Sequence, residues 1–76
     1  MEAENIVDEN IKHIGKFMRM ARLNSGHTID ALAAKAGLSN QTITNMEFSK
    51  GAINLKTLLA AANSLSVKIT LNIEKV

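Results

Sequence analysis

The sequence predicts a mostly α-helical fold, in which four helices form a compact domain and a C-terminal β-strand follows them. Three observations lead to this prediction. Apolar residues recur every three or four positions over most of the chain, as they do along the buried face of an α-helix. Capping and turn residues divide this pattern into separate helices. At the C-terminal end the apolar spacing becomes two, which is the period of a β-strand.

Length and composition indicate one globular domain. The chain has 76 residues, of which 46% are apolar and 21% are charged, and both fractions are ordinary for a globular protein. No run approaches the roughly 18 apolar residues of a membrane span, and no signal-peptide pattern precedes the domain. The absence of cysteine excludes disulfides and thiolate metal sites, and it fits a reducing compartment. We therefore expect a cytoplasmic protein without membrane contact.

The charged residues are distributed unequally along the chain. Residues 1–10 contain four acidic residues and no basic ones, whereas the remainder contains all nine lysines and arginines against three acidic residues. We expect residues 1–5 to be a flexible acidic leader, residues 6–66 to be the folded domain and residues 67–76 to be the strand. A basic folded body favours a polyanionic partner such as nucleic acid.

A stretch in the middle of the chain has the pattern of two short helices joined by a tight turn, the helix-turn-helix motif. Thr28 can cap the first helix, Gly37 can end it in a left-handed conformation, and Ser39 can cap the second. The second helix has only Ile43 and Met46 as apolar anchors. Its other positions carry mainly amides and hydroxyls, which suit contact with the edges of DNA base pairs.

The helix before this motif is expected to begin near Ile6, where Asn5 can act as its cap. Its apolar stripe advances in steps of three and four and consists of Val7, Ile11, Ile14, Met18 and Ala21. Lys12, Lys16 and Arg19 lie away from this stripe. They form a solvated face or contact phosphates, and the sequence leaves both possibilities open.

The fourth helix is expected to follow Asn54 as its cap, and its core-facing residues are Leu55, Leu58, Leu59, Ala62 and Leu65. The apolar residues of the strand alternate with polar ones and are Val67, Ile69, Leu71 and Ile73. One strand in an otherwise helical chain lacks a partner, and its unpaired edges would favour aggregation. We therefore predict that it pairs antiparallel with the same strand of a second subunit and is the dimerisation element. The open alternative is a hairpin arm that pairs with a partner protein.

The block from Ile14 to Leu65 resembles the Xre/Cro/CI family of helix-turn-helix regulators, which includes the lambdoid phage repressors. The matching residues are Ile14-Gly15, Arg22, Leu32-Ala33, Ala36-Gly37-Leu38-Ser39, Ile43, Met46-Glu47 and Leu55-x-x-Leu58-Leu59. The resemblance implies a lambda-repressor-like DNA-binding domain. It also implies a salt bridge between Arg22 and Glu47 that ties the first helix to the end of the third.

The C-terminal end resembles one branch of this family more closely. Residues 63–71 are similar to the junction in HipB-like antitoxins, which replace the fifth helix by a strand that pairs across the dimer. Three positions depart from the pattern of the wider family. Ile29 stands where a glutamine commonly contacts DNA, and its apolar side chain cannot make that hydrogen bond. Ser49 replaces the usual glycine after the third helix, and Ile53 replaces the usual proline before the fourth.

The resemblance places base contacts on the exposed face of the third helix, at Asn40, Gln41, Thr44 and Asn45. Gln41 is the first choice because its longer side chain reaches deepest, and such an amide can bond adenine at two positions. The residues expected to contact phosphate are Thr28, Lys35, Thr42, Ser49, Lys50 and Gly51. Thr28 accompanies the free N–H groups at the N-terminus of the second helix, where the helix dipole favours an anion.

These features lead to the hypothesis of a sequence-specific transcriptional repressor that binds double-stranded DNA at a pseudo-palindromic operator as a homodimer. It would be associated with the nucleoid when bound. The alternatives are an antitoxin that binds a cognate toxin and also regulates its operon, a prophage regulator, and an activator. His13 and His27 are single histidines, so the sequence predicts no enzyme activity, no metal site and no cofactor.

Overall fold

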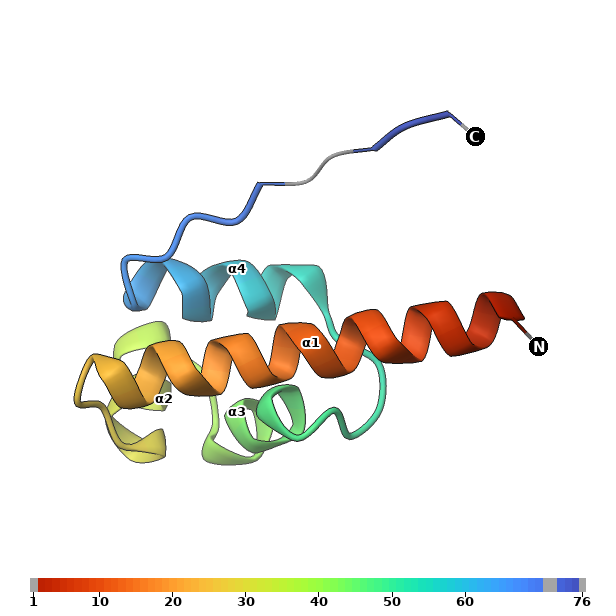
Figure 1. The fold of residues 1–76 in the computed structure, drawn as a ribbon. Coiled ribbons are helices and arrows are strands. Elements are labelled where there is room, and N and C mark those ends of the chain that lie inside the picture. The colour runs from red at the N-terminus through yellow and green to blue at the C-terminus, as the bar shows by residue number, and fades with distance from the viewer. Residues whose placement is uncertain (1, 71–72, 76) are drawn as a thin grey trace.

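A computed structural model of the chain describes residues 2–70 and 73–75, and these residues form four helices (Figure 1). The helices are α1 (Glu2–Asn24), α2 (Ile29–Ala36), α3 (Asn40–Glu47) and α4 (Leu55–Ser64). Helix α2 packs against α3 and α4, and α1 packs against α3. The described residues therefore contain the four helices that the apolar spacing predicts.

The first helix begins at Glu2, earlier than the start expected near Ile6. The backbone of residues 2–5 is thus helical. These residues include neither proline nor glycine, and alanine and glutamate are strong helix formers. Local propensity therefore extends the helix beyond the apolar stripe on which the expected start was based.

The turn between α2 and α3 is made by the residues that the sequence indicated. The Thr28 hydroxyl accepts a hydrogen bond from the Ala31 amide at 3.0 Å, which caps α2. Gly37 follows α2 with φ of 69°, a left-handed conformation that glycine adopts without steric cost. The Ser39 hydroxyl then accepts a hydrogen bond from the Thr42 amide at 3.1 Å and caps α3.

Helix α1 crosses the end of α3 at Gly15, and the two backbones approach closely there. A Cβ atom at this position would lie 2.7 Å from the Met46 carbonyl oxygen and 2.8 Å from that of Glu47. Ser49 follows α3 with φ of 56°, so this serine has the left-handed conformation for which the family commonly uses glycine. Ser49 thus holds a backbone conformation that favours glycine.

The core lies between the four helices. Its buried apolar residues are Met18, Leu32, Ala33, Ile43, Met46, Leu58, Ala61, Ala62 and Leu65. Three residues expected in the core are instead exposed, namely Ile14 at 36%, Leu55 at 49% and Leu59 at 44%. Helix α4 is rotated so that Ala61 faces inward, and its small side chain lets the neighbouring helix come close. The apolar stripes of α1 and α4 thus extend past the edge of the core.

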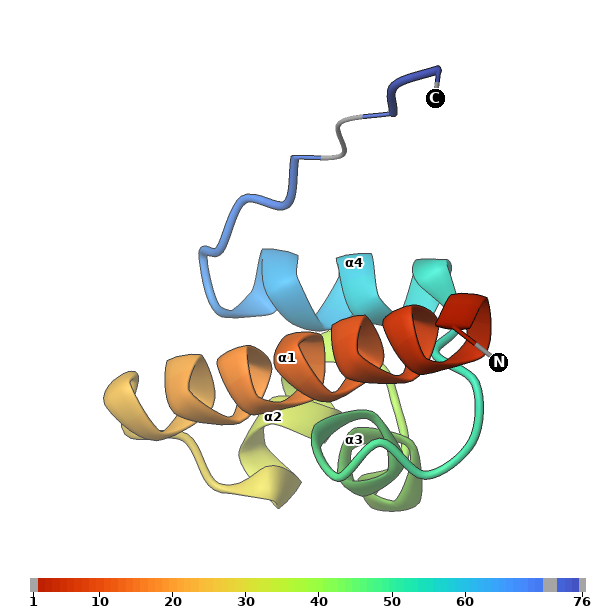
Figure 2. The same ribbon diagram turned by 45° about the vertical axis from the view of Figure 1, so that its right-hand side comes forward.

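The chain reverses direction after α4 and leaves the domain. In Figures 1 and 2, α4 lies between this C-terminal segment and the other helices. Val67 and Ile69 pack against the core, whereas Ile73 is 90% exposed. Within residues 67–70 and 73–75 no strand is formed, and Leu71 lies outside the described residues. Since the predicted strand takes its hydrogen-bond partner from a second subunit, the strand and the dimer both remain predictions.

Candidate nucleic-acid interface

Helix α3 presents a polar surface above two buried anchors. Ile43 is fully buried and Met46 is 4% exposed, and together they hold the helix on the core. On the outer side, the four residues expected to read bases are exposed or half-buried, and they are Asn40, Gln41, Thr44 and Asn45. The helix therefore offers amide and hydroxyl groups to a partner without losing its own packing.

Gln41 and Asn45 form a bonded pair of amides on this surface. The Gln41 Nε2 donates a hydrogen bond to the Asn45 Oδ1 at 2.8 Å across one helical turn. This bond leaves the carbonyl oxygen of Gln41 and the amide nitrogen of Asn45 for other partners. An acceptor and a donor side by side match the N6 amino group and the N7 atom of adenine. The pair can therefore act as one reading unit.

Asn40 has a different environment from the other three residues. Its Nδ2 donates a hydrogen bond to the Asp30 Oδ1, which connects the first turns of α3 and α2. Sequence reasoning missed this role of Asp30. Because the two residues are ten positions apart and on different helices, no spacing rule indicates the contact. The bond directs Asn40 toward α2 and places a carboxylate beside the N-terminus of that helix.

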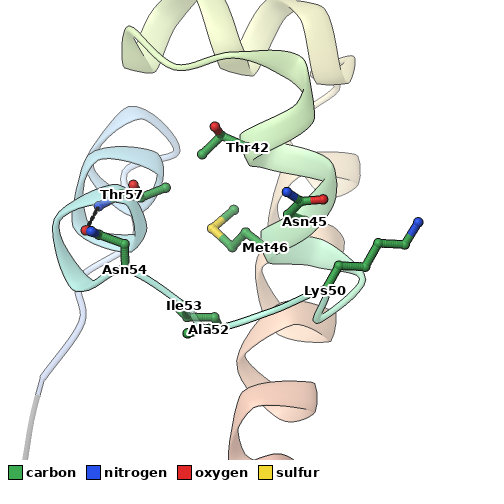
Figure 3. A pocket seen from close by; sticks show the side chains of 8 residues that line it. All are labelled: Thr42, Asn45, Met46, Lys50, Ala52, Ile53, Asn54 and Thr57. Atoms are coloured by element: carbon green, nitrogen blue, oxygen red, sulfur yellow. Dashed lines mark hydrogen bonds between the residues drawn. The ribbon is translucent and has the colours of Figure 1, made fainter.

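A small hollow between α3 and the start of α4 brings together Thr42, Asn45 and Lys50 (Figure 3). Its volume is about 130 Å³, and its other lining residues are Met46, Ala52, Ile53, Asn54 and Thr57. In Figure 3 the Lys50 side chain extends outward, away from α4. Two expected phosphate contacts thus lie next to one expected base contact.

Ser49 and Gly51 face the opposite side of the same loop. With Ile11 and Lys12 of α1 they line a second hollow of about 290 Å³. The Ser49 hydroxyl donates to the Ile11 carbonyl oxygen at 3.4 Å and so points toward α1. The loop after α3 therefore separates the expected phosphate contacts into two groups.

The remaining expected phosphate contacts lie on α2. Thr28 is exposed at the N-terminus of this helix, and Lys35 is exposed in its last turn. These two residues are therefore at opposite ends of the helix. Thr28 caps the helix whose first turn contains Asp30, and Lys35 lines neither of the two hollows beside the loop after α3.

The ion pair implied by the family resemblance is present between Arg22 and Glu47. Its two hydrogen bonds run from Arg22 Nε to Glu47 Oε2 at 2.7 Å and from Arg22 Nη2 to Glu47 Oε1 at 3.0 Å. Arg22 is 7% exposed and Glu47 is 3% exposed. Arg22 Nη1 also donates to the His27 carbonyl oxygen at 2.9 Å. One guanidinium thus joins α1, the start of the helix-turn-helix motif and the end of α3.

The hydrogen bonds that Arg22 donates to Glu47 raise the pKa of Arg22 above its ordinary value, because the carboxylate stabilises the protonated guanidinium. Burial opposes this effect, and the charge of Glu47 adds to it. A raised folded-state pKa stabilises the fold below the unfolded-state pKa, and the effect is lost only as pH rises through the folded-state pKa. Since an arginine titrates far above neutrality, its contribution is constant around neutral pH.

A contact between Arg19 and Phe48 was not expected from the sequence. The Arg19 guanidinium carbon lies 5.2 Å from the centre of the Phe48 ring, within the range of a cation–π interaction. Phe48 follows Gln41 and Thr44 by steps of seven and four, so helical spacing places it at the end of the polar surface of α3. That spacing is the signal from which the position of Phe48 could have been found.

A small four-helix fold in which α3 stands on two anchors and exposes a polar surface defines a helix-turn-helix DNA-binding domain. A family model described as Helix-turn-helix (HTH_3) matches residues 18–72, so the chain belongs to this family of Xre/Cro/CI-type regulators. It is accordingly a DNA-binding transcription regulator. A search of curated proteins finds no match.

Among the described residues, no helix is long and apolar enough to cross a membrane. The same part of the chain contains no group of three or more metal-ligating side chains.

Proposed function

We propose that this regulator is a cytoplasmic repressor that binds a pseudo-palindromic operator as a homodimer, with α3 in the major groove. The observation that carries the proposal is the amide pair Gln41–Asn45, exposed on a helix whose end is held by a buried ion pair. Thr44 lies beside the pair and can contact a thymine methyl group. The half-sites would be about 34–36 Å apart, which is one turn of DNA.

Phosphate contacts supply most of the affinity in this proposal. Thr28 and the N-terminus of α2 contact one backbone strand, and Lys50 with Thr42 contacts the other. The outward direction of Lys50 in Figure 3 supports this assignment. Asn40 is the weakest base reader of the four, because Asp30 already holds its amide group. The amides of Ser49 and Gly51 and the Lys35 side chain complete the proposed set.

The homodimer is proposed to form through Val67, Ile69, Leu71 and Ile73. An open apolar groove of about 430 Å³ supports this assignment, and it lies where α1, α4 and the C-terminal segment meet. Its lining residues are His13, Ile14, Phe17, Met18, Leu58, Ile69 and Thr70. Phe17 is 59% exposed, so the single chain leaves much of this surface uncovered. A second copy that pairs its strand beside Ile69 would cover it.

Band-shift titration against the promoter of its own operon tests the proposal. We expect a specific complex whose affinity falls steeply with salt, and a repeat with shuffled promoter DNA should require far more protein. A promoter fragment that binds no better than the shuffled sequence would overturn the repressor assignment.

An antitoxin that also regulates its operon is the second candidate. It is favoured by the similarity of residues 63–71 to HipB-like antitoxins, and its partner would be a cognate toxin. The gene beside this one distinguishes the candidates. A kinase-like or ribonuclease-like neighbour supports the antitoxin, whereas phage genes support a prophage regulator. Co-purification of the two gene products then tests toxin binding directly.

A further inference from the structure

We propose that Lys12, Lys16 and Arg19 of α1, named here the α1 basic row, bind DNA phosphates beside the major-groove site. The inference rests on the proposed DNA-binding function and adds a contact surface that lies outside the helix-turn-helix motif. The surface is built from three cations on a helix that does not itself enter the groove.

The three cations share one face of α1. Their spacing of four and three residues places them in line along the helix, and all three are exposed. The row spans about 10 Å, at 1.5 Å per residue. Each DNA strand presents one phosphate for about every 3.4 Å of helix axis. The length of the row therefore matches a short run of neighbouring phosphates.

The row is continuous with the surface that faces the bases. Its residues line a hollow of about 260 Å³ together with Glu47, Phe48 and Ser49, which lie at the end of α3. Phe48 lies at the end of the polar surface of α3, and the Arg19 guanidinium is 5.2 Å from its ring centre. A DNA backbone that leaves the major groove past this end of α3 would meet Arg19 first and then Lys16 and Lys12.

The charge of the row is not neutralised by the ion pairs in the described part of the chain. Those pairs join His13 to Glu9 and Arg22 to Glu47, and neither includes a residue of the row. Glu47 also lines the hollow, but its side chain is buried and its carboxylate accepts both bonds from Arg22. Three exposed cations next to the groove-binding helix thus favour a polyanion that is already bound there. An acidic protein would have no such continuity with α3.

The salt dependence of DNA binding tests the row. The row variant is Lys12→Gln/Lys16→Gln, and a second variant adds Arg19→Gln. The control is Lys68→Gln, which removes one charge from the C-terminal segment, on the far side of α4 from α3. Lys68 alternates with the apolar residues proposed for the dimer contact, and sedimentation velocity checks that each variant keeps the oligomeric state of wild type. All the substituted side chains are exposed, and circular dichroism checks that each variant stays folded.

The slope of the logarithm of the association constant against the logarithm of the salt concentration is negative. We expect its magnitude to decrease by about 0.9 for each phosphate that the protein no longer binds. For the row variant, which loses two cations, the decrease should be up to ~1.8 for each bound chain. The weakening should be the same on operator and on random DNA, because phosphates carry no sequence information. Addition of Arg19→Gln should decrease the magnitude of the slope further, and the control should leave it unchanged.

Two results would overturn the inference alone. The first is an unchanged salt slope in the row variant, which would assign the row to another partner such as an acidic protein. The second is a change of the salt slope in the control that equals the change in the row variant. In both cases the wild-type protein still binds its operator, so the proposed function stands. A wild-type protein that binds no DNA would instead overturn the function and the row together.

Discussion

Arg22 and Glu47 hold the first and third helices together through a buried pair of hydrogen bonds, 2.7 Å and 3.0 Å long. The third arm of the same guanidinium bonds the His27 carbonyl oxygen at 2.9 Å. His27 directly precedes the Thr28 cap of α2, and Glu47 is the last residue of α3. The pair therefore sets the position of both ends of the helix-turn-helix motif relative to α1, although neither side chain is exposed for contact with DNA.

Removal of one partner of this pair should be strongly destabilising. Glu47→Gln keeps the size of the side chain but leaves the Arg22 charge buried without its carboxylate. We expect the free energy of unfolding to fall by about 3–5 kcal/mol, measured by urea unfolding with circular dichroism. Stability equal to that of wild type would contradict this role of the pair.

The double variant Arg22→Met/Glu47→Leu is the control for that prediction. It removes both charges and fills the space with apolar groups, so it should recover much of the lost stability. Its operator affinity should stay below that of wild type, because α3 is no longer aligned by the guanidinium. Recovery of both stability and affinity would show that the pair does not orient α3.

Gly15→Ala should destabilise the fold, although alanine usually stabilises a helix relative to glycine by about 0.5–1 kcal/mol. The new Cβ would lie within 3 Å of the Met46 and Glu47 carbonyl oxygens, and α1 would have to move away from α3. We expect a loss of about 1–3 kcal/mol in thermal or urea unfolding. Asn10 lies at an exposed position of α1. The difference in the free energy of unfolding between Asn10→Ala and Asn10→Gly therefore gives the ordinary effect of alanine against glycine in this helix. If alanine is more stabilising than glycine at position 15 as well as at position 10, the close contact is refuted.

Gln41→Ala should reduce the preference for the operator over random DNA, because it dismantles the amide pair with Asn45. One good base contact contributes about 1–3 kcal/mol of discrimination. The measurement is a band-shift titration of the same variant on both DNAs. Lys50→Gln is the matched control, since removal of a phosphate contact should weaken binding to both DNAs equally. Unchanged specificity in Gln41→Ala would show that other residues read the bases.

Ile73→Asp should convert the proposed dimer to monomers without loss of the fold. Ile73 is 90% exposed in the single chain, so the substitution has no core contact to break. Sedimentation velocity measures the oligomeric state, and operator affinity should fall with it because the two half-sites are no longer linked. Leu23→Asp, at a 50% exposed position of α1, is the control. A dimer that survives Ile73→Asp would refute the assignment of the strand.

Much of the fold could be predicted from local sequence. The caps at Thr28, Ser39 and Asn54 and the left-handed Gly37 lie where the residue types indicated, because a cap depends on atoms within three or four positions. The anchors of α3 could be predicted for the same reason, since an isolated apolar pair on a polar helix has one face to bury. The Arg22–Glu47 pair came from the family resemblance, because its residues are 25 positions apart.

Other features were decided only by the tertiary structure. The sequence by itself determined where the helices form and which of their faces are apolar, because both depend on residues that are near neighbours in the chain. Tertiary packing decided the rest. The rotation of α4, which exposes Leu55 and Leu59 and buries Ala61, depends on how closely a neighbouring helix packs. The bond between Asp30 and Asn40 and the stacking of Arg19 on Phe48 likewise require two helices to meet at a particular angle. Spacing along one chain defines each face of a helix, but only packing decides which atoms lie opposite it.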